Sequence, residues 1–112
     1  MRRILPWLAT LSLVVLLLFA PSAGAQGKTA TVSIQNFAFN PPNTTVAPGT
    51  TVTWVNNDQA PHTVTATNPA GAFDSGTLQP GQRFSHTFTT VGTKAYHCEI
   101  HPSMKGSVTV KR

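Results

Sequence analysis

The chain has 112 residues, of which 40% are hydrophobic and 10% are charged, and its formal net charge at pH 7 is +5. This length accommodates one small domain with a modest core. The basic residues are scattered and no aromatic residues interleave with them, so the charge does not indicate a nucleic-acid-binding protein.

The N-terminal segment is typical of a secretory signal peptide. A positively charged start, Met1-Arg2-Arg3, precedes an apolar run from Leu8 to Ala20, and small residues follow at Ala23-Gly24-Ala25. We predict cleavage after Ala25, which leaves residues 26–112 as one periplasmic or otherwise secreted domain. The apolar run is shorter than the roughly 20 residues of a membrane span, so no span is expected after cleavage. A retained N-terminal anchor is the alternative.

The remaining 87 residues contain a single cysteine, Cys98, so a disulfide within the chain is excluded. A lone thiol in an exported domain indicates intermolecular pairing, a reactive nucleophile or a metal ligand. A nucleophile would need a base and an oxyanion pocket, and the sequence suggests neither. The chain is therefore not expected to be an enzyme.

After the leader, hydrophobic and polar residues alternate with period two in short runs rich in Thr, Val and Phe. Turn signals such as Pro48-Gly49, Asn56-Asn57-Asp58 and Pro80-Gly81 separate these runs. The pattern predicts a single all-β domain, an antiparallel sandwich or barrel. The predicted strands are 29–35, 51–56, 62–66, 83–89, 93–98 and 107–111.

Three residues whose side chains can bind a metal ion follow one another at intervals of three: Cys98, His101 and Met104. Thiolate, imidazole and thioether together suit copper, and a blue copper centre has two histidines, one cysteine and a weak axial methionine. Zinc accepts cysteine and histidine, but its structural sites rarely use methionine. The loop therefore predicts a copper site that needs a second histidine.

Three other histidines are available for this place. His97 adjoins Cys98, so in a strand its side chain points to the opposite face. His86 lies in mid-strand with the parity of Phe84 and Phe88, which favours a structural, partly buried histidine. His62 opens a predicted strand directly after Ala60-Pro61 and is the preferred fourth ligand.

Across nearly all of residues 26–112 the sequence resembles the cupredoxins, most closely their amicyanin and plastocyanin branch. The resemblance rests on Val52-Thr53-Trp54-Val55-Asn56, Pro61-His62-Thr63-Val64, the loop from Cys98 to Met104, and Gly106-Ser107-Val108-Thr109-Val110. It implies a Greek-key β-sandwich with one type 1 copper ion that alternates between Cu(I) and Cu(II). His62 and His101 would then supply imidazole nitrogens, Cys98 the thiolate and Met104 the axial thioether.

One position departs from the family pattern. Relatives often have asparagine after the first ligand histidine, where its amide ties the two ligand loops together, whereas this chain has Thr63. Its hydroxyl is expected to make part of that network. The aromatic residues, Phe37 and Trp54 among them, are expected to pack in the core.

The resemblance implies a monomeric one-electron carrier that docks transiently onto a redox protein donor and acceptor through its His101 face. Pro102, Ala60-Pro61 and residues 69–71 are candidates for an apolar patch on this face. The alternative is a copper-binding module for storage, scavenging or delivery. Delivery proteins favour exposed sites rich in methionine or histidine, and the single closed ligand set with few methionines favours the electron carrier.

Overall fold

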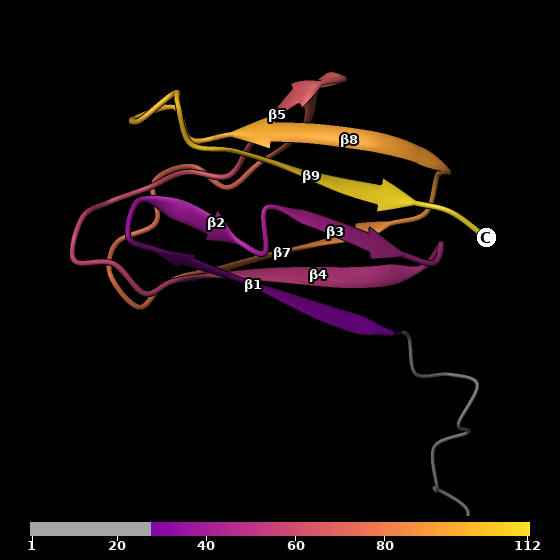
Figure 1. The fold of residues 1–112 in the computed structure, drawn as a ribbon, viewed down its shortest axis with the longest axis horizontal. Coiled ribbons are helices and arrows are strands. Elements are labelled where there is room, and N and C mark those ends of the chain that lie inside the picture. The colour runs from indigo at the N-terminus through magenta and orange to yellow at the C-terminus, as the bar shows by residue number, and fades with distance from the viewer. Residues whose placement is uncertain (1–27) are drawn as a thin grey trace, which may run out of the picture.

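The computed structural model describes residues 28–112, so the predicted signal peptide, 1–25, lies outside the described residues. Figure 1 shows strands joined by turns and loops, and within residues 28–112 no helix is long and apolar enough to cross a membrane. The strands are β1 (Thr29–Gln35), β2 (Ala38–Asn40), β3 (Asn43–Val46), β4 (Thr50–Asn56), β5 (Thr65–Asn68), β6 (Ala70–Asp74), β7 (Arg83–Phe88), β8 (Gly92–His97) and β9 (Lys105–Val110).

The strands form two layers, as Figure 1 shows. One sheet has the order β2-β1-β4-β7 and the other has the order β3-β9-β8-β5-β6. Five of the seven strand pairs are antiparallel, as expected, whereas β1–β4 and β3–β9 are parallel. The predicted all-β sandwich is confirmed, and the parallel pairs come from crossovers that a period-two pattern does not reveal.

The core lies between the sheets and is centred on Trp54, which is 0% exposed. Trp54 lies in β4, a strand in which every second residue, Trp54 included, is buried. Its indole packs against Phe73, Phe84, Phe88 and Tyr96, with ring centroids 5.3–6.2 Å apart. Truncating a buried aromatic of this kind to alanine costs about 3–5 kcal/mol. The aromatic cluster therefore gives the sandwich a rigid interior.

A close approach between β8 and β9 requires a glycine. Gly106 pairs with Tyr96, and a Cβ atom at Gly106 would lie 2.5 Å from Tyr96 Cζ. Tyr96 is 1% exposed, and burial raises its pKa to about 12. The Tyr96 ring therefore fills the core near the end of β8, two residues before Cys98.

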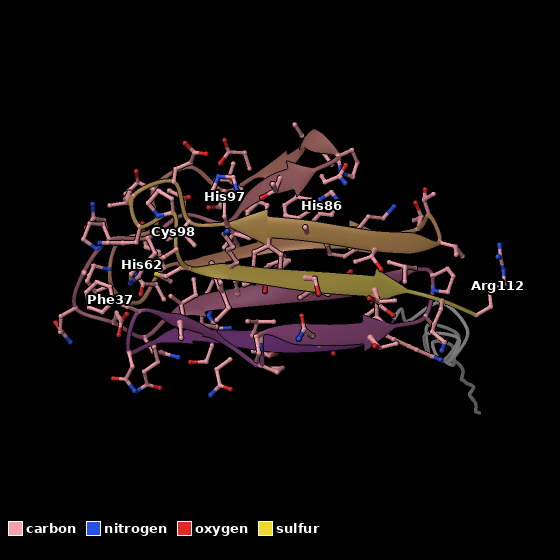
Figure 2. The ribbon with its side chains drawn as sticks, turned by 45° about the horizontal axis from the view of Figure 1, so that its top comes forward. Phe37, His62, His86, His97, Cys98 and Arg112 are labelled. Atoms are coloured by element: carbon pink, nitrogen blue, oxygen red, sulfur yellow. The ribbon has the colours of Figure 1, made fainter. Side chains whose placement is uncertain are left out.

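His86 lies on the same face of β7 as Phe84 and Phe88 and is partly buried, as expected. Its ring contacts Phe73 and Phe88, with centroids 5.0 and 4.7 Å away. It lines a cavity of about 320 Å³ together with Pro69 and Lys94. Figure 2 shows His86 away from Cys98 and His62.

Candidate metal centre

Two chain segments meet at one end of the sandwich and bring three predicted ligands together. Cys98 Sγ lies 3.7 Å from His62 Nδ1 and 3.8 Å from His101 Nδ1. The three donor atoms all lie within 4.8 Å of one another. Figure 2 shows His62 and Cys98 at the end of the sandwich opposite Arg112. Both imidazoles thus present the same nitrogen to the sulfur.

His62 does not open a regular strand as expected. It forms an isolated antiparallel bridge with Leu78, in which the His62 N–H donates to the Leu78 carbonyl (3.1 Å) and the Leu78 N–H donates to the His62 carbonyl (2.7 Å). The side chain of His62 is 0% exposed. A pair of backbone hydrogen bonds therefore holds this histidine at the end of the core, and β5 begins only at Thr65.

The other three predicted ligands belong to one loop between β8 and β9. The Cys98 N–H donates to the Met104 carbonyl (3.0 Å), and the Met104 N–H donates to the His101 carbonyl (2.8 Å). Cys98 is 0% exposed and Met104 is 5% exposed. Because the loop closes on itself, it turns its thiol and its thioether into the protein and leaves His101 partly exposed.

The donor separations fit a single metal ion. An ion about 2.0–2.3 Å from each of three donors in a plane leaves roughly 3.5–4.0 Å between any two of them, and the two sulfur–nitrogen distances lie in this range. Two imidazoles, a thiol and a nearby thioether form the donor set that copper prefers. The chemistry of these residues and the two sulfur–nitrogen separations therefore fit copper.

The remaining histidines lie outside this cluster. His97 faces the opposite side of β8 from Cys98, as expected, where its Nε2 lies 2.5 Å from Glu99 Oε2 and its Nδ1 contacts the Thr67 hydroxyl. His86 lies in the cavity described above. The described residues thus contain one group of three possible metal ligands of the His, Cys, Asp or Glu type.

Thr63 ties the two ligand segments together, as its place after His62 predicts. Its backbone N–H donates to Cys98 Sγ at 3.3 Å, and its hydroxyl accepts the Glu99 N–H at 2.8 Å. The first contact stabilises negative charge on the sulfur. The second contact fixes the backbone at Glu99, the residue that follows Cys98. The threonine hydroxyl therefore connects the loop that an amide would connect in the expected family pattern.

Asp58 is a site residue that the sequence interpretation missed. Its Oδ2 lies 2.8 Å from His62 Nε2, and it accepts the N–H groups of Asn36 (2.7 Å) and Phe37 (2.9 Å). Burial raises the pKa of the Asp58 carboxyl, but the hydrogen bonds from Phe37, His62 and Asn36 outweigh burial and lower this pKa below its ordinary value of 3.8. No local motif distinguishes this aspartate from an ordinary turn residue, which is how the run Asn56-Asn57-Asp58 was interpreted.

The turn between β1 and β2 places an exposed aromatic residue over the cluster. Asn36 and Phe37 have φ values of 56° and 55°, and Gln35 pairs directly with Ala38. Positive φ at both central residues is typical of a type I′ hairpin turn, which usually carries glycine second, and a residue with a side chain pays about 1–2 kcal/mol there. The prediction that Phe37 packs in the core is wrong, because 54% of this residue is exposed at the turn.

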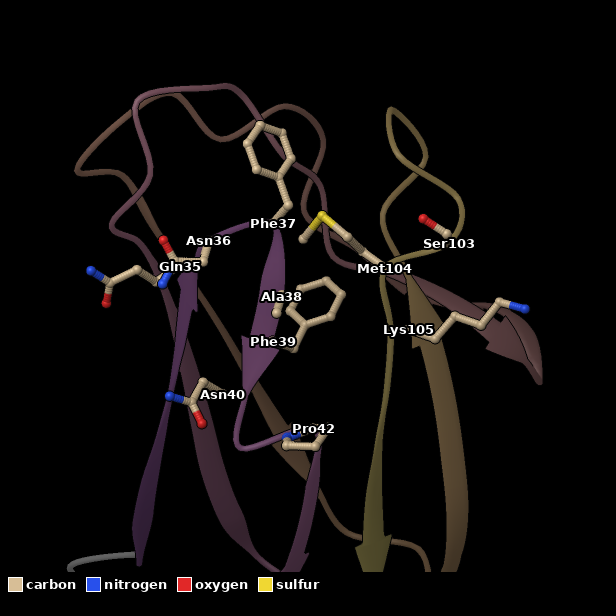
Figure 3. A pocket seen from close by; sticks show the side chains of 10 residues that line it. All are labelled: Gln35, Asn36, Phe37, Ala38, Phe39, Asn40, Pro42, Ser103, Met104 and Lys105. Carbon is tan, nitrogen blue, oxygen red and sulfur yellow. The ribbon is translucent and has the colours of Figure 1, made fainter.

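A surface hollow of about 460 Å³ adjoins the cluster. Phe37 and Met104 both line it, together with Phe39 and polar residues of the β1–β2 hairpin (Figure 3). The hollow is thus lined in part by a proposed copper ligand, the buried Met104.

Comparison with known proteins agrees with this geometry. Residues 26–111 match the family model of copper-binding proteins of the plastocyanin/azurin family. Amicyanin from Paracoccus denitrificans is 35% identical over 96 residues, which cover 83% of this chain and 72% of amicyanin. Plastocyanin from Scenedesmus fuscus is 38% identical over 84 residues, which cover 65% of this chain and 86% of that protein.

Solved structures are similar as well. A purple cupredoxin from Nitrosopumilus maritimus superimposes with a TM-score of 0.68 at 34% identity, over 73% of this chain and 99% of that one. The expected sandwich and the expected kind of metal are both confirmed by these similarities.

Proposed function

This chain belongs to the plastocyanin/azurin family of copper-binding proteins, and we propose that it carries single electrons between redox proteins, with His62, Cys98, His101 and Met104 as its copper ligands. The chain has a type 1 copper site and is not an enzyme. The observation that carries the proposal is the convergence of two Nδ1 atoms on one buried thiol, 3.7 and 3.8 Å away.

Each proposed ligand has a defined part. Bound copper supplies a one-electron couple between Cu(I) and Cu(II). Cys98 provides a thiolate whose charge the Thr63 N–H stabilises, His62 and His101 provide neutral imidazoles, and Met104 provides a weak thioether. Soft sulfur favours Cu(I) and imidazole serves both oxidation states, so the set accommodates either one.

The scaffold around these ligands supports rapid exchange of electrons. His62 is fixed by its bridge to Leu78, and the loop from Cys98 to Met104 is fixed by its own backbone hydrogen bonds. Ligands held by packed strands and hydrogen bonds keep one geometry in both oxidation states. Little atomic rearrangement then accompanies the transfer.

Electrons are proposed to enter and leave through His101. This histidine is partly exposed, whereas His62 is 0% exposed. Two of the three exposed large hydrophobic residues in the described part of the chain, Phe37 and Ile100, lie at this end, and the third, Val91, precedes β8 at the other end. An apolar surface of this kind suits transient docking of a redox protein.

The proposed docking face includes part of the patch expected from sequence. Pro102 is exposed, and Ala60 and Pro61 are partly exposed beside His62. Pro69 instead lines the cavity that contains Lys94 and His86. Residues 69–71 are therefore left out of the proposed face.

The ligand assignment is tested by the visible spectrum of the copper-loaded, oxidised protein. We expect an intense thiolate-to-Cu(II) band that Cys98→Ala abolishes and His62→Ala strongly alters. His86→Ala serves as the matched control, because this histidine lies outside the site, and it should leave the band unchanged. A band that survives Cys98→Ala would contradict the assignment.

Two rates separate an electron carrier from a storage or delivery protein. A carrier with buried ligands should exchange electrons rapidly between its own oxidised and reduced copies and release copper slowly to a chelator. Slow self-exchange together with rapid copper release would favour storage or delivery.

Export is also part of the proposal, with residues 1–25 as a cleaved signal peptide and residues 26–112 as the mature periplasmic or otherwise extracytoplasmic domain. The family match begins at residue 26, which supports this boundary. N-terminal sequencing of the protein recovered outside the cytoplasm should begin at Gln26. A chain that keeps Met1 and sediments with membranes would indicate a retained anchor.

A further inference from the structure

One carboxylate joins the proposed ligand His62 to the turn that carries Phe37. Asp58 lies 2.8 Å from His62 Nε2 and accepts the N–H groups of both central turn residues, Asn36 and Phe37. We propose that Asp58 is a positioning residue of the copper centre, which fixes the imidazole of His62 and the aromatic ring of Phe37 as one unit. This inference rests on the proposal that His62 is a copper ligand.

The first part of this role concerns the tautomer of His62. An ionised carboxylate only accepts hydrogen bonds, so Nε2 of His62 carries the proton and its Nδ1 presents a lone pair. That Nδ1 faces Cys98 Sγ at 3.7 Å. A carboxylate on the outer nitrogen makes an imidazole a stronger donor to its metal. Stronger donation stabilises Cu(II) relative to Cu(I) and lowers the reduction potential.

The second part concerns the turn. Phe37 has a φ of 55°, a backbone conformation in which glycine is usual. Both turn N–H groups point to the Asp58 carboxylate, which gives the strained turn two charge-assisted hydrogen bonds. In this position the Phe37 ring stands edge-on to His62 and to His101, with interplanar angles of 85° and 90°. Asp58 therefore also sets the ring that covers both imidazoles.

Asp58 is itself held in place. Its N–H donates to Asn56 Oδ1 at 3.0 Å. The Asn56 side chain, 0% exposed, donates in turn to the carbonyls of Ala60 (2.9 Å) and Leu78 (2.8 Å). Since Leu78 is also the bridge partner of His62, the carboxylate and the imidazole share one rigid frame.

The decisive experiment compares Asp58→Asn with Glu99→Gln in the copper-loaded protein. Both substitutions remove one negative charge near the site, but Glu99 contacts His97 and no proposed ligand side chain. The reduction potential should rise clearly more in Asp58→Asn than in Glu99→Gln, while both keep the thiolate-to-Cu(II) band. Equal shifts in the two variants would overturn the proposal.

The metal-free protein gives an independent readout. Exchange of the Asn36 and Phe37 amide protons and of the His62 Nε2 proton with solvent should be slow in the unaltered chain. It should become at least tenfold faster in Asp58→Asn and stay unchanged in Glu99→Gln. Unchanged exchange in Asp58→Asn would overturn the proposal even if the copper ligands are as proposed. Absence of a type 1 spectrum in the unaltered chain would instead contradict the ligand assignment.

A second pair of variants tests the proposal if Asp58→Asn does not fold. Glycine at position 37 adopts positive φ without strain, so Phe37→Gly should support the turn without the carboxylate. Phe37→Gly/Asp58→Asn is then compared with Phe37→Gly alone. The His62 Nε2 proton should exchange at least tenfold faster in the double variant, and equal exchange in the two would count against a role for Asp58.

Discussion

The ring of Phe37 meets the imidazole of His101 edge-on, with ring centroids 5.0 Å apart and ring planes at 90°. It meets the imidazole of His62 in nearly the same way, at 5.2 Å and 85°. The Phe37 ring therefore lies against both imidazoles, and because 54% of the residue is exposed, it offers the rest of its surface to solvent or to a partner.

Removing this ring should open the copper site to small anions. In Phe37→Ala, we expect azide to perturb the spectrum of the oxidised copper protein at a concentration about tenfold lower than in the unaltered chain, equivalent to ~1.4 kcal/mol. Val91→Ala removes an exposed apolar side chain at the other end and should change nothing. An azide titration measures both variants, and identical curves for Phe37→Ala and the unaltered protein would show that the ring does not control access.

A charge on the proposed docking face should slow electron exchange between copies of the protein. Ile100 and Val91 are similarly exposed, at 43% and 44%, but only Ile100 lies in the ligand loop. Ile100→Glu places like charges opposite each other when two such faces meet, and we expect self-exchange to fall by about tenfold or more at low salt.

The matched control for that experiment is Val91→Glu, which changes the net charge equally. It should leave the self-exchange rate, measured by NMR line broadening of mixed oxidation states, nearly unaltered. If both variants slow exchange to the same extent, docking does not use the His101 end.

Thr63 should stabilise the metal-free fold through its hydroxyl. Thr63→Val keeps the shape of the side chain and the backbone N–H to Cys98 Sγ, but it removes the acceptor of the Glu99 N–H. We expect the free energy of unfolding in urea to fall by about 1–2 kcal/mol. Thr63→Ser retains the hydroxyl and should recover most of the loss, whereas an unchanged free energy of unfolding in Thr63→Val would contradict a role for the hydroxyl.

His86 should make stability depend on pH. Burial among aromatic rings lowers the pKa of His86 from its ordinary value of 6.5, so the unfolded chain binds a proton more readily than the folded one. The contribution to stability is complete above pH 6.5 and is lost as the pH falls from 6.5 through the lower pKa of the folded state.

Substitution of His86 isolates this contribution. In the metal-free protein, His86→Phe should lose less stability than the unaltered chain on acidification below pH 6.5, as judged by urea midpoints at a series of pH values. Parallel pH profiles for the two proteins would contradict the expectation.

Strands with strict alternation were predictable from sequence. Residues 29–35 were expected as a strand and form β1, and β4, β7, β8 and β9 lie within two residues of their predicted ends. Strands β2, β3 and β6 were not expected, because all three lie at sheet edges, have five residues or fewer, and are flanked by proline or turn residues. In β6 only Phe73 is buried, so no alternation marks it.

The site was predictable to the extent that its residues lie close together in sequence. The spacing of Cys98, His101 and Met104 predicted that they share one loop. The position of His62, directly after Pro61 at the start of a predicted strand, indicated the distant histidine. Asp58 and Phe37 could not be found in this way. Their roles depend on a left-handed turn that meets a carboxylate 21 residues later in the chain, and neither the turn nor the contact follows from periodicity.

The closed loop between β8 and β9 also affects how the protein and its metal come apart. Three of the four proposed ligands lie within the seven residues from Cys98 to Met104, so the denatured chain keeps a local chelate that needs no sandwich. Affinity of the denatured chain for a ligand reduces the stabilisation that the ligand gives the native state. Copper should therefore raise the unfolding temperature by less than its native affinity implies, and refolding can begin with the metal already attached and end when His62 joins it.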